Sequence, residues 1–582
     1  MSKTTTEKKM ILGLFSEKGA DFLIPDYQRA YAWKKEECQK LWEDLYGFAF
    51  PGDKCEDFDE KGEYFMGPMV TFRNEEDAFE VIDGQQRLTT LLLLLRAFYE
   101  KIGKMQQDKP TALLMDDLAK CIWKTTGLGE PDKERLKIDS KVAADDDKKE
   151  FLSILKDGIA PEKMKSKYAE NYRFFQVQID DFLLKNPKNF LYLPRRILDY
   201  CFILMIDAGN QDDALRIFST LNDRGLPLAD ADIFKAKFYR YYTEIGKSDT
   251  FIKQWKDLEE HCGKMFKARS GNPVDELFTR YMYFIRAKQG ITKSTMKGLR
   301  MFYEESVKDK EQPIAFDKDL FESLRQLVKF WSDVENQDSE RFNERVLRRL
   351  YVLDSAPNGM WANIVSVYFM QNKDADGMLD GEPFCRFLEK ITAFTWAYSL
   401  MGHTVGEFRA PVFAEMANIV NGRKVEFSEY QFDAEEVRAQ FEQTEFSNQR
   451  PITRSMLTWW AFTDEKKQTV VPSLDKKFDI EHIVAQRLQE EHHVLSDGKN
   501  LESLGNKSLL EKAINIRAAD FRFSDKRTCY KEGTKRSNGG TIIQELLTLA
   551  DKDDFREADI IARKEQMLNA FIDFLKENNL TK

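Results

Sequence analysis

The sequence predicts an α+β protein that is mainly helical. Gly contributes only 29 of the 582 residues and Pro only 16, so few residues interrupt helices. Hydrophobic residues make up 42% of the chain, which includes 44 Phe, 20 Tyr and 9 Trp, enough apolar mass to fold most of its length. Four short apolar segments bounded by polar residues have the length of strands. A chain of this size is expected to form several domains.

In the N-terminal part, predicted strands alternate with predicted helices. An apolar stretch ends at Pro25 and is followed by a polar loop and a helical pattern, and the same order recurs where a strand reaches Asp83 and a leucine-rich helix follows. Gly225 fits a left-handed helix end, and Asp230 or Asp232 can cap the next helix. The expected strands are 21–24, 79–82 and 200–206, and the expected helices are 34–46, 85–102, 212–221 and 233–242.

The rest of the chain is predicted to be helical with one further strand. Helix follows helix over 243–421, a strand is expected at 476–484, and helices close the chain from Thr541. The charged run 141–150 has no apolar period and is expected to be exposed. The predicted domains are 1–242, 243–425 and 426–582. No long linker separates them, so we expect them to pack on each other.

Charge and cysteine usage exclude several classes of protein. The net charge of −10 argues against a chain that binds nucleic acid over its whole surface, although 503–540 carries nine Lys or Arg against four Asp or Glu. The seven Cys are scattered without a C-x-x-C pair, which predicts buried free thiols. The longest apolar run, Leu88 to Leu95, is too short for a membrane span, and the polar N-terminus does not resemble a secretory signal. We therefore expect a cytoplasmic protein.

The first group of residues that could form a ligand site is Asp83-Gly84-Gln85-Gln86-Arg87, between a predicted strand and a predicted helix. The start of a helix offers unpaired amides, Gly permits close backbone approach, and an Arg can bind phosphate through two hydrogen bonds. The motif is therefore a candidate nucleotide site. The alternative is structural, with Asp83 capping the helix and Arg87 on a solvated surface.

Two further polar turns strengthen this interpretation. Tyr27-Gln28-Arg29 follows the first predicted strand, and Asn222 and Arg224 stand at the end of a predicted helix. With these companions, the sequences I-P-x-Y-Q-R, D-G-Q-Q-R-L-T and F-x-x-L-N-D-R-G resemble the N-terminal domain of GmrSD-type modification-dependent restriction endonucleases, a family that includes SspE-like anti-phage nucleases. The resemblance covers roughly residues 20–240.

A second group of residues could cleave a phosphodiester with the help of a metal ion. His482 supplies a base, and Glu481 or Asp479 together with Asn515 supplies oxygen ligands for a hard cation. The alternative is an ordinary histidine on a strand beside charged neighbours.

The spacing of this second group resembles a His-metal-finger (HNH) nuclease, and 479–526 also resembles the C-terminal domain of GmrSD-type enzymes. The resemblance implies that His482 is the general base and that Asn506 orients the loop. It further implies that Asn515 with Glu481 or Asp479 holds the metal, and that Lys526 contacts DNA phosphate or the transition state. Asp520 departs from the family, which usually has Asn there.

The resemblance also implies folds and activities. It implies a ParB/sulfiredoxin-like α/β domain with helical additions that binds and hydrolyses a nucleoside triphosphate (ATP, GTP, CTP or UTP). The residues implied to bind the nucleotide are Asp83, Gly84, Gln85, Gln86, Arg87, Asn222 and Arg224. Those implied to sense DNA are Tyr27, Gln28 and Arg29. It implies a helical middle region and a C-terminal ββα-metal (HNH) domain embedded in helices that uses Mg²⁺ or Mn²⁺. The expected substrate is double-stranded DNA, such as phage DNA, distinguished by its modification, and a homodimer is one expected form.

Two other functions remain open at this stage. One is a nucleotide-gated DNA-binding switch with a silent nuclease domain. The other is an RNA-cleaving toxin that uses the same finger.

Overall fold

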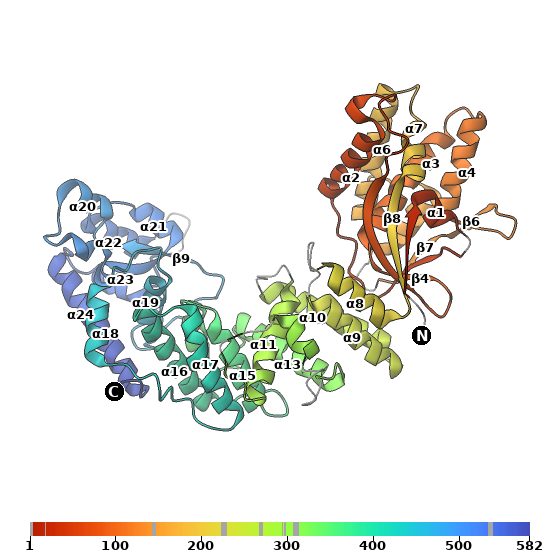
Figure 1. The fold of residues 1–582 in the computed structure, drawn as a ribbon. Helices are drawn as coiled ribbons and strands as arrows, with labels where there is room; N and C mark the ends of the chain where they lie inside the picture. Colours follow the sequence, from red (N-terminus) through yellow and green to blue (C-terminus); the bar gives the residue numbers. More distant parts are fainter. Residues whose placement is uncertain are drawn as a thin grey trace. The chain divides into compact units, whose positions relative to one another are not determined.

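The computed structural model describes residues 4–17, 19–142, 147–222, 230–266, 272–293, 295, 298–305, 314–533 and 539–582. The protein is α+β and 58% helical, as the sequence predicts. It divides into two compact units, Met1–Asp257 and Leu258–Lys582 (Figure 1). The second unit contains the predicted nuclease region and the predicted connector from Leu258 onward, whereas residues 243–257 belong to the first unit. Their treatment as separate domains stays a prediction.

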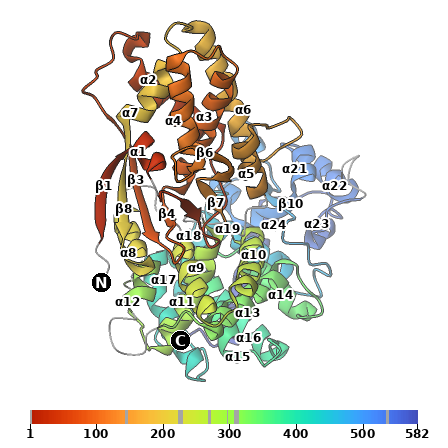
Figure 2. The same cartoon turned by 90° about the vertical axis from the view of Figure 1, so that its right-hand side faces the viewer.

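The first unit is built on a mixed six-stranded sheet with the order β1-β8-β3-β4-β2-β7 (Figure 2). Neighbours in the β8-β3 and β4-β2-β7 stretches are parallel, whereas β1 and β8, and β3 and β4, are antiparallel. The strands are β1 (Thr5–Met10), β2 (Phe22–Ile24), β3 (Tyr64–Arg73), β4 (Phe79–Asp83), β7 (Ile138–Ser140) and β8 (Cys201–Ala208), with a separate hairpin of β5 (Trp123–Thr125) and β6 (Pro131–Leu136).

Helices cover both faces of this sheet. Side chains alternate along each strand, so each face carries apolar residues that pack against helices. Val81 and Met205 belong to the large core on one face, whereas Ile82 and Ile206 pack with α8 and α9 on the other. The helices of this unit are α1 (Ile11–Ser16), α2 (Lys35–Ala49), α3 (Gln85–Gly103), α4 (Lys109–Ile122), α5 (Lys148–Asp157), α6 (Lys167–Lys185), α7 (Tyr192–Tyr200), α8 (Gln211–Asn222) and α9 (Asp230–Glu244), and α10 (Ser248–Met265) crosses the boundary between the units.

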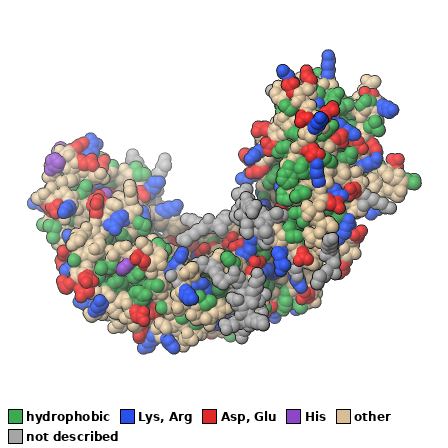
Figure 3. Space-filling view, viewed as in Figure 1, with side chains coloured by type: hydrophobic (Ala, Val, Ile, Leu, Met, Phe, Trp, Pro, Cys, Tyr) green, Lys and Arg blue, Asp and Glu red, His purple; other side chains and the backbone are tan. Residues whose placement is uncertain are grey.

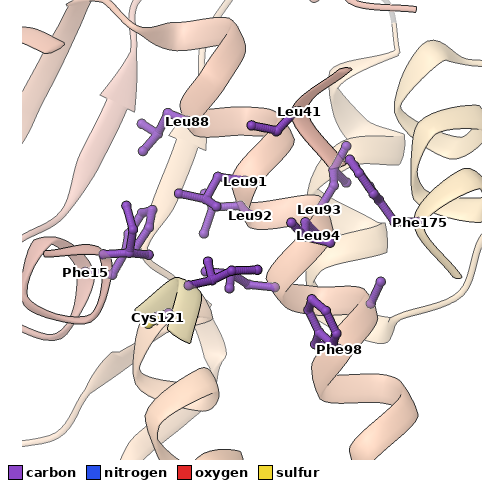
Figure 4. Close-up of a cluster of buried hydrophobic side chains, with 14 of the residues drawn as sticks. Phe15, Leu41, Leu88, Leu91, Leu92, Leu93, Leu94, Phe98, Cys121 and Phe175 are labelled. Atoms are coloured by element: carbon purple, nitrogen blue, oxygen red, sulfur yellow. The ribbon is translucent and has the colours of Figure 1, made fainter. Parts of the chain in front are cut away.

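Helix α3 forms the centre of the larger core. Its five consecutive leucines, 91–95, are all fully buried, because neighbouring elements surround the helix on several sides. Figure 4 shows Leu91 to Leu94 beside Phe15, Leu41, Cys121 and Phe175, which come from other helices. This packing fixes the helix whose first turn carries the predicted nucleotide motif.

Most predicted elements of the first unit are confirmed within a few residues. The strands expected at 21–24, 79–82 and 200–206 are β2, β4 and β8. The structure adds β1 and β3, which the sequence analysis missed; β1 is polar and mostly exposed at the sheet edge, so it lacks an apolar pattern. The cap expected at Gly225, like the central part of the charged run 141–150, lies outside the described residues.

The second unit is a helical assembly that carries one β-hairpin. The helices are α11 (Pro273–Lys288), α12 (Leu299–Glu305), α13 (Lys318–Glu335), α14 (Glu344–Asp354), α15 (Met360–Asn372), α16 (Gly381–Leu400), α17 (Val405–Val420), α18 (Ala434–Gln443), α19 (Pro451–Phe462), α20 (Gln486–His492), α21 (Lys512–Ala518), α22 (Phe523–Glu532), α23 (Gln544–Leu549) and α24 (Glu557–Glu577). The hairpin consists of β9 (Phe478–His482) and β10 (Lys507–Glu511), and the short 3₁₀ helices Gly498–Glu502 and Leu504–Asn506 precede β10.

A buried arginine joins the helical region to the segment that precedes the hairpin. Arg348 on α14 is fully buried and donates hydrogen bonds of 3.2 and 2.8 Å to the carbonyls of Phe462 and Gln468. A buried guanidinium is costly to desolvate, so these carbonyl partners fix α14 against the end of α19.

Charged side chains of both signs are interspersed over the visible face of each unit rather than gathered into one block (Figure 3). All seven Cys are free, as predicted, and every one except Cys55 is buried. None of the helices in the described ranges has the length and apolar character that a bilayer span requires.

Candidate functional site

Two of the predicted motifs meet at the head of α3. Gln85 donates a 2.9 Å hydrogen bond from Nε2 to the carbonyl of Arg29, and Oε1 of Gln86 accepts a 2.7 Å hydrogen bond from the Ala32 amide. Both glutamine side chains are buried. They therefore hold the 29–33 loop against the first turn of α3, while the Arg29 side chain itself is exposed.

The first turn of α3 has an open backbone. Gly84 is the N-cap residue, in a left-handed conformation with φ of 93°, and because it has no side chain it makes no side-chain capping hydrogen bond. Asp83 does not cap the helix in the usual way; its Oδ1 accepts a 2.7 Å hydrogen bond from the adjacent Gly84 amide. The helix start thus retains the amides and the positive dipole end that favour an anion.

Arg87 lies in a narrow space beside β3. Its Nη1 donates a 2.8 Å hydrogen bond to the Pro68 carbonyl, and a Cβ on Gly67 would lie 2.8 Å from the guanidinium carbon. Burial lowers the pKa of Arg87, and burial raises the pKa of Asp83 against the opposing effect of Arg87 and Arg29. A phosphate approaching Arg87 would compensate a cation that is already partly desolvated.

The remaining N-terminal predictions have different positions. Tyr27 is buried on the other face of the sheet, where its ring centroid lies 5.3 Å from that of Tyr239. Gln28 donates a 3.1 Å hydrogen bond to the Ile82 carbonyl. Arg224 and the side chain of Asn222 lie outside the described residues. The structure therefore brings together 83–87 with Gln28 and Arg29 and leaves Tyr27 in a core.

The C-terminal predictions are distributed over two faces of the β9–β10 hairpin. The register pairs Glu481 with Ser508 and His482 with Lys507. Because side chains alternate along a strand, Asp479 and Glu481 share one face and His482 lies on the other. The α21 and α22 helices follow β10 and lie near β9 in Figure 1.

On the first face, Glu481 is enclosed by two partners from α22. Its Oε1 accepts hydrogen bonds of 2.7 Å from Lys526 Nζ and 2.6 Å from Tyr530 OH. Lys526 also donates to the carbonyl of His482 at 2.6 Å. The side chains of Glu481 and Lys526 are 4% and 1% exposed. In this arrangement the lysine neutralises a buried carboxylate, and a phosphate group in solvent cannot reach it.

Asp479 and Asn515 form a more open pair on the same face. The Asn515 amide lies 3.4 Å from Asp479 Oδ2, and both residues are half-buried. One carboxylate and one amide oxygen suit a hydrated Mg²⁺, which usually retains several waters. Glu481 is less accessible, because it is buried and its Oε1 is bonded to Lys526 and Tyr530. Within the described ranges, no three His, Cys, Asp or Glu residues cluster as a metal site.

On the second face, His482 belongs to a charged chain of contacts that the sequence analysis missed. Its Nε2 lies 2.9 Å from Glu502 Oε1, and the other Glu502 oxygen accepts from Lys507 Nζ at 2.6 Å. Lys507 is fully buried and also donates to Asn448 at 2.6 Å. Burial raises the pKa of Glu502, but His482 and Lys507 outweigh it and lower the pKa to about 2. Glu502 is therefore ionised at neutral pH.

Asn506 fixes the chain around His482. Its Nδ2 donates to the carbonyls of Val484 and Leu501, each at 3.1 Å, and its Oδ1 accepts from the Val484 amide at 2.8 Å. The side chain is fully buried, so it satisfies backbone groups and touches no solvent. This position agrees with the loop-orienting role that the resemblance implies.

Comparison with known proteins identifies both ends of the chain. Residues 11–239 match the family described as the GmrSD restriction endonuclease N-terminal domain, and residues 431–570 match the GmrSD restriction endonuclease C-terminal domain. No individual curated protein matches the chain. The two matches contain the two groups of polar residues described above, one in each unit.

The buried pair of Glu481 and Lys526 predicts that substitutions of the two residues have strongly non-additive effects on the free energy of unfolding. Glu481→Gln and Lys526→Met should each reduce the free energy of unfolding of the second unit by about 3–5 kcal/mol, because each leaves a charge buried without its partner. The double variant should lose less than the sum of the two. Urea unfolding of the four proteins measures this cycle.

The exposed ion pair between Lys531, which is also on α22, and Asp551, 2.8 Å away, provides the control. Lys531→Met should change stability by no more than about 1 kcal/mol. Equal effects of Lys526→Met and Lys531→Met would show that the buried pair has no special structural role.

Proposed function

The chain belongs to the GmrSD restriction endonuclease family, and on that premise we propose that it is a metal-dependent DNA endonuclease of anti-phage defence, regulated by a nucleoside triphosphate. The proposed cleavage centre lies at the β9–β10 hairpin, and the proposed nucleotide site lies at the head of α3. The substrate is double-stranded DNA distinguished by its modification.

The contact between His482 and Glu502 is the observation that carries this proposal. A carboxylate 2.9 Å from Nε2 favours the tautomer in which Nε2 carries the proton and donates a hydrogen bond to Glu502. The Nδ1 atom then has a free lone pair, and no contact to it is seen within the described part of the chain. His482 can thus accept a proton from water at Nδ1, while ionised Glu502 stabilises the imidazolium that forms.

A divalent cation would be held by Asp479 and Asn515 on the neighbouring face. When bound, Mg²⁺ or Mn²⁺ would stabilise negative charge on the cleaved phosphodiester. Glu481 could join these ligands only through Oε2, because Lys526 and Tyr530 are bonded to Oε1. Lys526 and Asn506 act on the backbone around His482, so their proposed contribution is to keep the base in position.

The N-terminal proposal depends on an anion site assembled from two motifs. The open amides at the start of α3, Arg87 and the exposed Arg29 supply donors to a triphosphate. For the nucleotide to regulate cleavage, it must bind the active and inactive forms with different affinity, and cognate DNA must change nucleotide affinity by the same factor.

The nuclease assignment predicts that His482→Ala loses DNA cleavage by about 10²–10⁴-fold, because a general base is removed. Glu502→Gln should lose part of the rate, since the amide still contacts the ring but no longer stabilises its charged form. It also removes the carboxylate partner of buried Lys507, so its unfolding is measured alongside the rate. Nicking and cutting of plasmid and modified phage DNA with Mg²⁺ or Mn²⁺ measures both rates, and RNA is tested in parallel.

His492→Ala, at an exposed histidine on α20, is the matched control and should cleave at the wild-type rate. Wild-type rates in His482→Ala would remove the proposed base. Preferential cutting of RNA would favour the toxin alternative, and binding without cleavage in the wild type would favour a DNA-binding switch.

The cation assignment predicts different effects of three substitutions on one face. Asp479→Asn and Asn515→Ala should raise the Mg²⁺ or Mn²⁺ concentration needed for half-maximal cleavage by roughly tenfold or more. Glu481→Gln should lower stability with a smaller change in this metal requirement. EDTA should stop cleavage by the wild type, and cleavage that persists in EDTA would exclude a metal-dependent reaction.

The nucleotide assignment predicts that Arg29→Ala and Arg87→Ala each weaken triphosphate binding by about tenfold, because each removes a charge-assisted contact. Arg29 is exposed, so its substitution tests binding without disturbing the core. Calorimetry with each of the four nucleotides measures affinity. Arg73→Ala, at an exposed arginine on the same sheet, should bind like wild type, and unchanged binding in Arg29→Ala and Arg87→Ala would make the α3 turn structural.

A further inference from the structure

The exposed side of α21 and the turn after it carry large apolar side chains beside the proposed cleavage centre. Ile516 is 67% exposed and Phe521 is 50% exposed. Among the large apolar side chains described in the second unit, Ile516 is the most exposed. Single exposed apolar residues are common on protein surfaces, but two within six positions next to a polar centre call for a partner.

Helical spacing places these residues around Asn515. Lys512 is three residues before Asn515 and four before Ile516, so the three side chains are neighbours on the helix surface. Only Ile514 and Ala518 of α21 are buried, and Lys512, Ala513 and Ile516 are exposed. Asn515 itself contacts Asp479, so this surface adjoins the proposed cation ligands.

The turn after α21 holds Phe521 outward. Ala519 has a φ of 40°, a conformation that residues other than Gly rarely adopt. The next helix is fixed at its start by buried Phe523 and by Lys526, which is bound to Glu481. Anchors on both sides therefore fix a strained turn that leaves Phe521 and Arg522 in solvent.

The charges at this surface suit a polyanion. Lys512 and Arg522 are exposed, and neither makes an ion pair within the part of the chain that the structure describes. A cavity of 720 Å³ whose lining includes Glu502 has the opposite character. Its charged lining consists of Glu442, Glu445, Asp497 and Glu502 against Lys499 and Lys564. The two cations outnumber Asp520, the exposed carboxylate of the same turn, so this surface attracts phosphate more strongly than the cavity does.

We propose that Lys512, Ile516, Phe521 and Arg522, here called the α21 rim, form a wedge that enters a groove of duplex DNA next to the cleaved phosphodiester. Ile516 and Phe521 insert against the bases and unstack one step, and Lys512 and Arg522 neutralise the flanking phosphates. The inference rests on the proposed nuclease function and adds that the substrate is a duplex deformed at the cleavage site.

The experiment compares the full-length wild type with Ile516→Ala/Phe521→Ala. Binding to a short DNA duplex is measured by fluorescence anisotropy in Ca²⁺, and unstacking is measured from the emission of 2-aminopurine placed at successive positions. The double variant should bind roughly tenfold more weakly or worse and lose the 2-aminopurine signal. Its thermal unfolding should match that of the wild type, because both side chains are exposed.

A matched control removes two equally exposed apolar side chains elsewhere in the unit. Val470→Ala/Ile561→Ala, at residues 53% and 49% exposed, should bind and unstack DNA like the wild type. Arg522→Gln should lower the slope of log affinity against log salt concentration by about one.

Four outcomes would overturn the wedge. DNA binding and unstacking by Ile516→Ala/Phe521→Ala at wild-type levels would do so, as would a change in oligomeric state without a change in DNA binding. A wild type that cuts DNA without any 2-aminopurine response would refute the wedge and leave the nuclease intact. A wild type that neither binds nor cuts DNA would instead refute the proposed function and the wedge with it.

Discussion

The buried contact between Glu481 and Lys526 organises the whole neighbourhood of the β9–β10 hairpin. A carboxylate and an ammonium group with almost no exposure must be paired, because the desolvation cost of either alone is several kcal/mol. The pair ties the first turn of α22 to the last residues of β9, and Tyr530 adds a second contact one helical turn later. The position of the turn before α22, with Phe521 and Arg522, follows from this anchor.

The same contact also constrains the proposed chemistry. Lys526 occupies an oxygen of the buried carboxylate that immediately precedes His482, so the half-buried pair of Asp479 and Asn515 on the same face is the more accessible place for a cation. On the opposite face, Glu502 and Lys507 form a second buried or half-buried charge pair around His482. The hairpin therefore places the proposed base and the proposed cation ligands on different faces of β9.

The first unit uses polar side chains in a comparable way. The side chains of Gln85 and Gln86 form hydrogen bonds with the backbone of the 29–33 loop. The backbone amides of α3, Arg87 and Arg29 are left to bind a ligand. Gly67 and Gly84 both have positive φ and permit the close approach of Arg87 and of Met69, respectively. The two glutamines of the motif therefore hold a loop, and only its backbone amides and Arg87 remain for a ligand.

The amino-acid sequence by itself determined the mainly helical α+β class, the strands β2, β4, β8 and β9, the free cysteines and the family, because apolar periodicity and short polar motifs are local properties of a chain. It did not predict β1, whose polar residues gain strand structure only by pairing with β8. Nor did it predict that Glu502 contacts His482 across 20 residues, that Lys526 is buried against Glu481, or that Tyr27 belongs to a core. These facts depend on contacts between segments distant in sequence, and on which face of a strand each side chain occupies. Packing alone decides both.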